Sequence, residues 1–168
     1  MKQRVEYLDI VDEKDRTIGK DTRENIHKKH LIHRGVHVFV LNNKGEILVQ
    51  KRARDKDYLP GFYDASVGGQ VLSGESYEQA AEREIKEELG LNFTNLKKVS
   101  DYHSYSERQK ENRRLFIVKA EGPFKIDKTE IESVKFWLPD QIQTEIGKFT
   151  PGFKISFGEL IKKGKITV

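Results

Sequence analysis

The chain has 168 residues, 36% of them hydrophobic and 35% charged, and its 31 basic and 27 acidic side chains give a formal net charge of +4. This length can bury a substantial core, and the mixed charges permit an anionic substrate without requiring nucleic acid as a partner. Because cysteine is absent, disulfides, thiolate catalysis and zinc–thiolate sites are excluded. With no apolar run of membrane length and no signal-peptide pattern, we expect a single domain over residues 1–168 that is cytoplasmic and makes no membrane contact.

The first third of the chain is expected to form mainly strands, because apolar residues gather there in short runs between turn signals. The tetrapeptide Asn42-Asn43-Lys44-Gly45 is typical of a tight hairpin turn, and Pro60-Gly61 indicates a loop. The elements expected here are strands 5–11 and 17–20, a short polar helix 22–29, and strands 36–41, 46–51 and 62–67.

Residues 76–89 give the strongest helix prediction in the chain. Ser76 and Gln79 fit a capping box, and Gly90 fits the position that ends a helix. Apolar residues recur at intervals of four along one face, which predicts packing against a sheet. These residues are Ala81, Ile85 and Leu89.

The rest of the chain is expected to add a second hairpin and then helices. Strands 96–105 and 113–120 are predicted to pair around a polar, solvent-exposed tip at 107–112. A strand at 133–138 precedes a helix from Pro139 to about Ile146, where proline suits the first turn. A last helix is expected over 150–163. Strands, one central helix, more strands and C-terminal helices favour a mixed-sheet α/β sandwich over a regular βαβ repeat.

The acidic residues of the central helix predict a metal site. Glu84, Glu87 and Glu88 have the i, i+3 and i+4 spacing that places side chains on one face. Such a cluster repels itself unless a cation binds, and hard oxygen ligands select Mg²⁺ or Mn²⁺. Gly69 has no side chain to hinder a further ligand from its carbonyl, and Arg83 is placed to brace the carboxylates together with Glu75.

Residues 69–91 resemble the Nudix signature at each of its defining positions, and the resemblance extends from about residue 5 to about residue 146. The matching positions are Gly69, Glu75, Arg83, Glu84, Ile85, Glu87, Glu88, Gly90 and Leu91. The resemblance implies an α/β/α sandwich with a mixed sheet. It also implies an enzyme that uses Mg²⁺ and water to hydrolyse a diphosphate in a nucleoside diphosphate derivative or a related small organic diphosphate.

The same resemblance implies roles for individual residues. Gly69, Glu84, Glu87 and Glu88 match the metal-binding positions, and the match to Glu84 sometimes acts as the general base. Arg83 and Glu75 match positions that mainly support these ligands, although Arg83 also counts among the candidate catalytic residues.

Segments outside the signature resemble the branch that includes isopentenyl diphosphate isomerase and uncharacterised bacterial hydrolases. These segments are 9–13, His33-Arg34, 48–52 and 58–65. Isomerases carry a catalytic cysteine where this chain has Gly68 and a metal-binding histidine where it has Gln70, although His33 does match an isomerase metal ligand. The departures favour hydrolysis. An isomerase-like enzyme and a non-catalytic nucleotide-binding module remain alternatives.

Several residues outside the helix are candidates for substrate contact. Arg52 suits two-pronged phosphate binding, but a solvated strand end is an equal alternative. Tyr63 and Gly68 lie just before the metal loop, and Tyr63 belongs to an aromatic group that suits either a substrate wall or the core.

Two further expectations concern the general base and assembly. Glu130 or Glu132, from a distal loop, is an alternative to Glu84 as the general base. His37 is expected to be a sheet residue, and nucleic acid is not an expected partner. By analogy with related hydrolases, a homodimer formed through the N-terminal strands is also considered.

Overall fold

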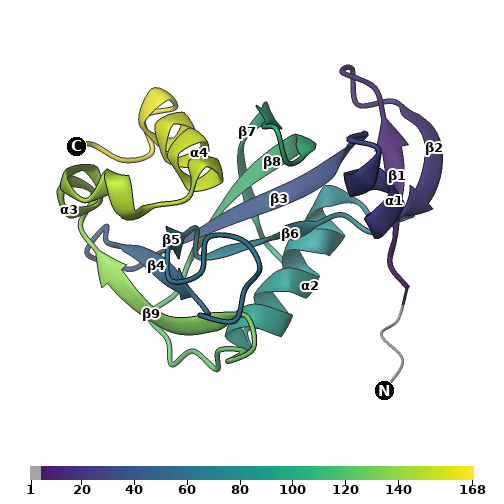
Figure 1. Ribbon diagram of the computed structural model, residues 1–168. Coiled ribbons are helices and arrows are strands. Elements are labelled where there is room, and N and C mark those ends of the chain that lie inside the picture. The colour runs from purple at the N-terminus through teal and green to yellow at the C-terminus, as the bar shows by residue number, and fades with distance from the viewer. Residues whose placement is uncertain (1–4) are drawn as a thin grey trace.

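A seven-stranded mixed sheet organises residues 5–168, the part of the chain described by the computed structural model (Figure 1). Its strands run in the order β5-β4-β3-β8-β7, while β6 pairs with β3 and β9 pairs with β4. The strand bounds are β3 Ile32–Leu41, β4 Ile47–Arg52, β5 Tyr63–Asp64, β6 Val67–Gln70, β7 Lys97–Tyr105, β8 Lys110–Lys119 and β9 Ile131–Trp137.

Strand β3 is the centre of this sheet, because three other strands pair with its two edges. Along one edge β8 runs parallel to it, from Ile32 opposite Lys110 to Leu41 opposite Lys119. Along the other edge β6 pairs antiparallel with its middle, from Gly35 to Val38, whereas β4 meets it only at Leu41 and Ile47. The sheet therefore separates into two branches beyond β3, and β6 carries Gly68 and Gly69 along one of them.

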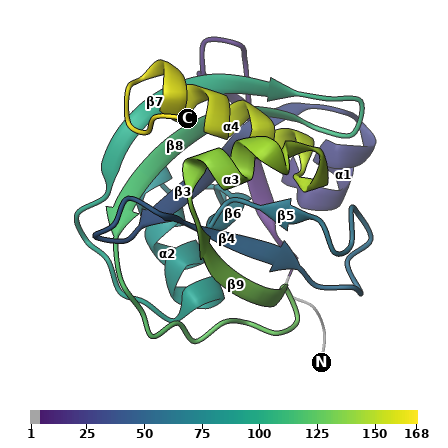
Figure 2. The same ribbon diagram turned by 90° about the vertical axis from the view of Figure 1, so that its left-hand side faces the viewer.

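Helices cover both faces of the sheet, which confirms the predicted α/β/α sandwich (Figures 1 and 2). Helix α2 (Tyr77–Leu89) buries Ala81, Ile85 and Leu89 completely against one face. Helices α3 (Pro139–Thr144) and α4 (Pro151–Lys162) lie on the other, where Phe153 packs near Phe39. Alternate β3 side chains supply the two cores because successive residues of a strand point to opposite faces.

The local signals at both ends of α2 act as the sequence predicted. Ser76 and Gln79 form a reciprocal capping box, and Gly90 ends the helix with a φ of 68°. This left-handed conformation is readily adopted only by glycine.

The N-terminal segment forms its own small layer beside the helix. Strands β1 (Tyr7–Val11) and β2 (Thr17–Thr22) make the predicted hairpin, and α1 (Arg23–Lys28) follows with Thr22 as its cap. The Ser73 N–H donates to the Tyr7 carbonyl at 2.8 Å, so the hairpin holds the loop before α2. Within residues 5–168, no helix has both the length and the apolar character needed to cross a bilayer.

Several predicted element bounds were wrong, and the causes are physical. Strand β3 starts at Ile32 rather than residue 36, and β8 starts at Lys110 rather than residue 113, because polar side chains in these extensions are buried and paired with each other. The expected strand 62–67 is two short strands, since β5 pairs with β4 and β6 with β3. Helix α3 stops at Thr144 and is followed by a 3₁₀ turn at Ile146–Lys148.

The packing of α2 gives a stability prediction. Ile85→Ala removes a fully buried side chain from the face that packs on β3, so we expect it to lower the free energy of unfolding by about 2–5 kcal/mol in urea denaturation. Lys86→Ala, at the next and exposed position of the same helix, is the matched control. We expect it to change stability by less than about 0.5 kcal/mol. Equal effects of the two substitutions would contradict the packing described here.

Candidate active site

The acidic side chains of helix α2 differ widely in how much of their surface is buried. The Glu84 side chain is 14% exposed and Glu88 is buried, whereas the Glu87 side chain is 59% exposed. Glu84 and Glu88 are one helical turn apart, so both face β6 and the loop around it. Glu87 lies at the outer edge of the same cluster.

Gly69 allows this helix face to approach the β6 backbone closely. A Cβ atom at residue 69 would overlap the Glu84 carboxylate. The absence of a side chain at this position is therefore required for Glu84 to lie against the strand. The Glu84 carboxylate and the main chain of Gly69 thus bring oxygen atoms close together. Hard divalent cations prefer oxygen ligands of this kind.

Arg83 fixes the position of Glu84 through a branched set of contacts. Its Nη1 donates to Glu84 at 2.7 Å, while Nε and Nη2 donate to the two oxygens of Glu75 at 2.8 and 2.9 Å. Nη2 also donates to the carbonyl of Gln70 at 2.9 Å. The expected Arg83–Glu75 support is therefore present, and it connects the helix to the residue that follows Gly69.

The electrostatics of the cluster favour a cation. Burial raises the pKa of Glu88 well above its usual value, and the negative charges of Glu84, Glu130 and Asp64 raise it further. Burial also raises the pKa of Glu84 to about 7, although Arg83 opposes the shift. A divalent ion would relieve both the desolvation and the mutual repulsion. The acidic residues therefore fit a metal chemically. In residues 5–168, however, no three acidic or histidine side chains already surround a single point, since Glu84 contacts Arg83 and Glu87 faces outward.

Strands β4 and β5 approach the cluster from the other branch of the sheet. The Gln50 amide lies 3.5 Å from the Glu88 carboxylate. Arg52, a candidate phosphate ligand, already donates from Nε and Nη2 to the Tyr58 carbonyl, and its Nη1 lies 3.6 Å from Asp64. Its two-pronged end thus holds the loop between β4 and β5.

The other two predicted substrate residues are placed differently. The Tyr63 ring packs against Trp137 and Phe149, with centroid distances of 5.1 and 5.4 Å, so it belongs mainly to the core. Gly68 pairs with His37 in the β3–β6 ladder and presents bare backbone next to the carboxylate cluster.

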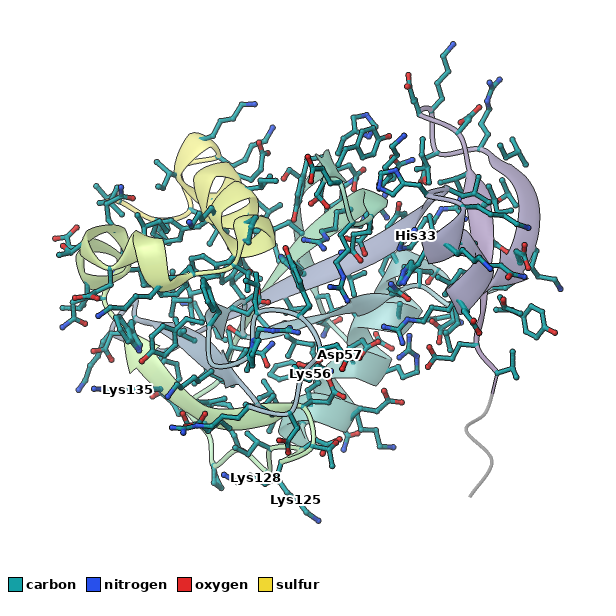
Figure 3. The ribbon with its side chains drawn as sticks, in the orientation of Figure 1. His33, Lys56, Asp57, Lys125, Lys128 and Lys135 are labelled. Carbon is teal, nitrogen blue, oxygen red and sulfur yellow. The ribbon has the colours of Figure 1, made fainter. Side chains whose placement is uncertain are left out.

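The two distal glutamates are distinguished by their surroundings. Glu130 forms an ion pair with Lys56, on the loop between β4 and β5 (Figure 3), and its charge acts on Glu88. Glu132 instead contacts Lys51 at 3.1 Å and Arg54 at 3.5 Å. Glu130 is therefore the distal glutamate that lies within electrostatic range of the carboxylate cluster.

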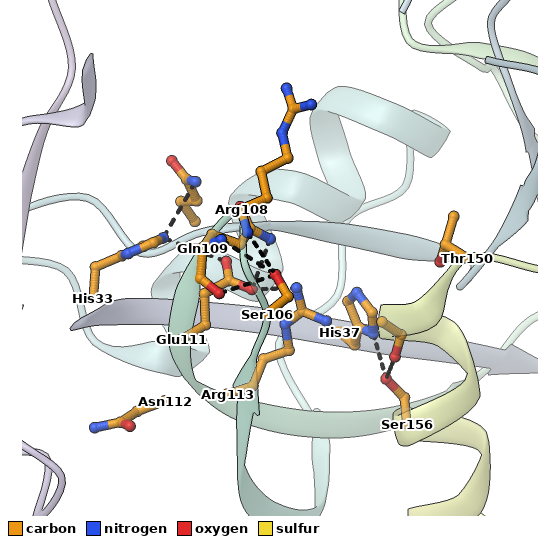
Figure 4. A network of polar contacts seen from close by, with 12 residues as sticks. His33, His37, Ser106, Arg108, Gln109, Glu111, Asn112, Arg113, Thr150 and Ser156 are labelled. Atoms are coloured by element: carbon orange, nitrogen blue, oxygen red, sulfur yellow. Dashed lines mark hydrogen bonds and ion pairs between the residues drawn. The ribbon is translucent and has the colours of Figure 1, made fainter. Parts of the chain in front are cut away.

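A buried polar network on the α4 side of the sheet was missed by the sequence predictions (Figure 4). His33 Nε2 lies 3.5 Å from Glu111, and Glu111 pairs with Arg113. His37 and Ser156 form a hydrogen bond beside them. Burial alone would raise the pKa of Glu111, but the charge of Arg113 and a hydrogen bond from His33 lower it to about 2.

A sequence signal for this network does exist. One buried side of β8 is made of alternate residues, and these include Glu111, Arg113 and Leu115. Because two of the three are polar, the sequence of this segment resembles a solvent-exposed hairpin tip. The expectation that residues 107–112 form that tip was therefore wrong for Lys110–Asn112, whereas the expectation that His37 lies in the sheet was correct.

Comparison with known proteins shows which family has this fold and this helix. The NUDIX domain model matches residues 31–154. An uncharacterized Nudix hydrolase of Yersinia pestis is 35% identical over 88% of this chain and 81% of its own length. The uncharacterized Nudix hydrolase YfcD of Escherichia coli K12 is 33% identical over 87% of this chain and 81% of its own length. The chain therefore belongs to the Nudix family and is a Nudix hydrolase.

Solved structures agree on the architecture. The crystal structure of DR0079 from Deinococcus radiodurans has a TM-score of 0.75 and 25% identity, covering 84% of this chain and 89% of the other. The MutT protein of Methanosarcina mazei has a TM-score of 0.70 and 20% identity, covering 80% and 96% of the two chains, and supports the fold alone.

The Glu111–Arg113 pair gives a pH-dependent prediction. At neutral pH we expect Glu111→Gln to lower the free energy of unfolding by about 3–5 kcal/mol, because it leaves Arg113 buried without its counter-ion. The folded pKa of Glu111, about 2, is below its usual value of 4.5, so the ionised group stabilises the fold above that usual value. This stabilisation is lost as the pH falls from about 4.5 to about 2.

The measurement is urea denaturation between pH 7 and pH 2.5, in which the difference between wild type and Glu111→Gln should shrink with falling pH. Glu107→Gln, at the exposed tip of the same hairpin, is the control and should show no such trend. A difference that stays constant across this range would contradict an ionised Glu111 in the folded state.

Proposed function

We propose that this Nudix hydrolase uses Mg²⁺, or Mn²⁺ in its place, to cleave a diphosphate linkage with water. The proposed substrate is a nucleoside diphosphate derivative or a related small organic diphosphate. The observation that carries the proposal is the burial of the Glu84 and Glu88 carboxylates beside the bare backbone of Gly69. Two buried acids that oppose each other's ionisation are suited to binding a divalent cation.

The residues that would hold the ion are the Gly69 carbonyl and the carboxylates of Glu84, Glu87 and Glu88. When bound, the ion neutralises the charge of the diphosphate and lowers the pKa of an attacking water. Arg83 supports this arrangement by holding Glu84 and the Gln70 carbonyl at once. A ligand position held by such surrounding contacts needs less reorganisation on binding.

A carboxylate within hydrogen-bond reach of the water would accept its proton. Glu84 and Glu130 are the two candidates for this step. Glu130 is held by Lys56 from the loop between β4 and β5, and its charge acts on Glu88. Arg52 orders the same loop through the Tyr58 carbonyl, which supports its assignment to the substrate side of the site.

The isomerase interpretation has no support of its own. The chain has no cysteine, and Gly68 occupies the position where such an enzyme has its catalytic thiol. The Gln70 side chain, at the position of a metal-binding histidine, contacts Arg23 and His27 at 2.8 Å each. Its polar groups are thus engaged within the protein.

The central test is removal of the two buried acids. We expect Glu84→Gln and Glu88→Gln each to lower phosphate release by at least about 100-fold, because each loses a proposed metal ligand and Glu84 is also a proposed base. The assay is release of phosphate or nucleotide from a panel of organic diphosphates with and without Mg²⁺. Glu82→Gln, on a different face of the same helix, is the matched control and should keep wild-type rates. Wild-type turnover in both test variants would refute the mechanism.

A second test separates the two distal glutamates. Because the charge of Glu130 acts on Glu88, we expect Glu130→Gln to lower kcat by about 10²-fold or more if it is the base. Glu132→Gln removes the same charge two residues away, where Lys51 and Arg54 hold it, and should stay within about threefold of wild type. A larger loss in Glu132→Gln than in Glu130→Gln would reverse the assignment.

A further inference from the structure

The guanidinium of Arg113, on β8, is the least satisfied charged group of the buried network. Arg113 is 7% exposed and its Nη2 donates to Glu111. In the part of the chain that the structure describes, its Nε and Nη1 have no hydrogen-bond partner within ordinary geometry, although the Tyr102 hydroxyl lies near the guanidinium. Burying a charged donor without an acceptor costs free energy, and native proteins rarely leave such a group unexplained. An acceptor from outside the chain would remove the cost.

Glycine backbone lies against this end of the side chain and against the neighbouring His37. Gly152, in the first turn of α4, lies so close to Arg113 that a Cβ atom there would come within 2.8 Å of Nη1. Gly68 faces His37 in the same way, and a Cβ atom there would come within 2.9 Å of the imidazole. Glycine is the residue that permits such close approach of backbone to side chains and ligands.

Arg113 lies next to the proposed metal site rather than in a separate part of the molecule. Gly68 directly precedes Gly69 and pairs with His37. Asp64 is close enough to act electrostatically on both Glu88 and Arg113. When a compound binds with its diphosphate at Glu88, Arg113 therefore lies beyond Gly68 and Asp64, on the side where the rest of the compound can extend.

Two loops enclose this side of the network. The tip of the β7–β8 hairpin contacts Glu111, because the Gln109 amide donates to its carboxylate at 3.2 Å (Figure 4). Arg108 stacks on the ring of Tyr58, from the loop between β4 and β5, at 4.4 Å from its centroid. Residues of the two loops thus contact each other beside the network.

The charges around Arg113 decide what kind of acceptor it can bind. Glu111 is ionised, because its pKa is lowered to about 2, and it already balances the charge of Arg113. Asp64 adds a second carboxylate nearby. Another anion would meet repulsion from both acids at low effective dielectric, whereas an uncharged oxygen would satisfy Nη1 without it.

We propose that Arg113 Nη1 is a specificity-determining donor that binds an uncharged carbonyl oxygen on the group attached to the substrate diphosphate. This inference rests on the proposed function, because it takes the diphosphate to be held at Gly69 and Glu88. Arg113 selects the substrate by this hydrogen bond: a substrate without the oxygen leaves the buried donor unpaired, which is an effective basis for discrimination.

The test uses two matched pairs of probes with the full chain and Mg²⁺. Inosine and adenosine diphosphate differ by a ring carbonyl in place of an amino group and by a proton on the adjacent ring nitrogen, as do uridine and cytidine diphosphate. In isothermal titration calorimetry, we expect the carbonyl member of at least one pair to bind wild type about 10-fold or more tightly than its partner.

Gly152→Ala is the decisive variant, because its Cβ atom would come within 2.8 Å of Nη1, so the guanidinium must shift from its present position while keeping its charge. We expect it to reduce the preference to within about threefold. Gly158→Ala, in the same helix with nothing within 4 Å of the added atom, is the matched control and should retain the full preference. Alanine suits a helix better than glycine, so neither variant should be destabilised through its helix.

Arg113→Lys and Arg114→Lys form a second matched set. Both keep the positive charge, but only the first changes the buried guanidinium, since Arg114 points to the opposite face and pairs with Asp101. We expect the preference to fall in Arg113→Lys and to persist in Arg114→Lys, with unfolding midpoints measured for each.

Equal affinities within both pairs, no binding of any probe, or a preference that survives in Gly152→Ala would each overturn the inference. Phosphorus NMR of the same samples reports turnover separately. Discrimination without turnover would retain the role of Arg113 and count against the hydrolytic mechanism, whereas turnover without discrimination would do the opposite.

Discussion

The close approach of α2 to the bare backbone of β6 is the constraint on which the rest of the site depends. Gly69 leaves room for the Glu84 carboxylate, and the apolar stripe of α2 fixes the helix at that distance from the sheet. The same contact buries Glu88 and brings it near Asp64 and Glu130. A side chain at residue 69 would displace the helix face, so the site and the core cannot be altered independently here.

The division of the sheet beyond β3 explains why one helix can meet groups from so many segments. Because β6 and β4 leave the same edge of β3 in succession, residues of β4 and β5 reach the acidic face from the side opposite β6. The chemistry is thus assembled between two branches of a single sheet. Loops supply Lys56 and Glu130, whereas the buried carboxylates are held on regular elements, which position side chains more rigidly than loops do.

Local signals predicted the central helix and its acidic face well, since caps, periodicity and carboxylate spacing all depend on residues close together in the chain. Ser76, Gln79 and Gly90 act at the helix ends as their residue types indicate. The polar network was not predictable by the same means. Glu111 looks like a solvent-exposed residue in sequence and His33 stands out there only as a match to a metal ligand, and only the pairing of β3 with β8 shows that each is the other's partner. Similarly, the position of Arg52 on the Tyr58 carbonyl depends on the path of a loop that no local pattern defines.

The parallel pairing of β3 with β8 also has a consequence for how the chain folds. Ile32 lies opposite Lys110 and Leu41 opposite Lys119, so this ladder closes a loop that contains β4, β5, β6, α2 and β7. The entropy of closing such a loop is lost before its contacts form, and non-local strand pairing slows folding for that reason. Helix α2, by contrast, can form from local interactions early. We therefore expect the geometry of the site to be acquired late in folding, when the sheet that orients the acidic helix has paired.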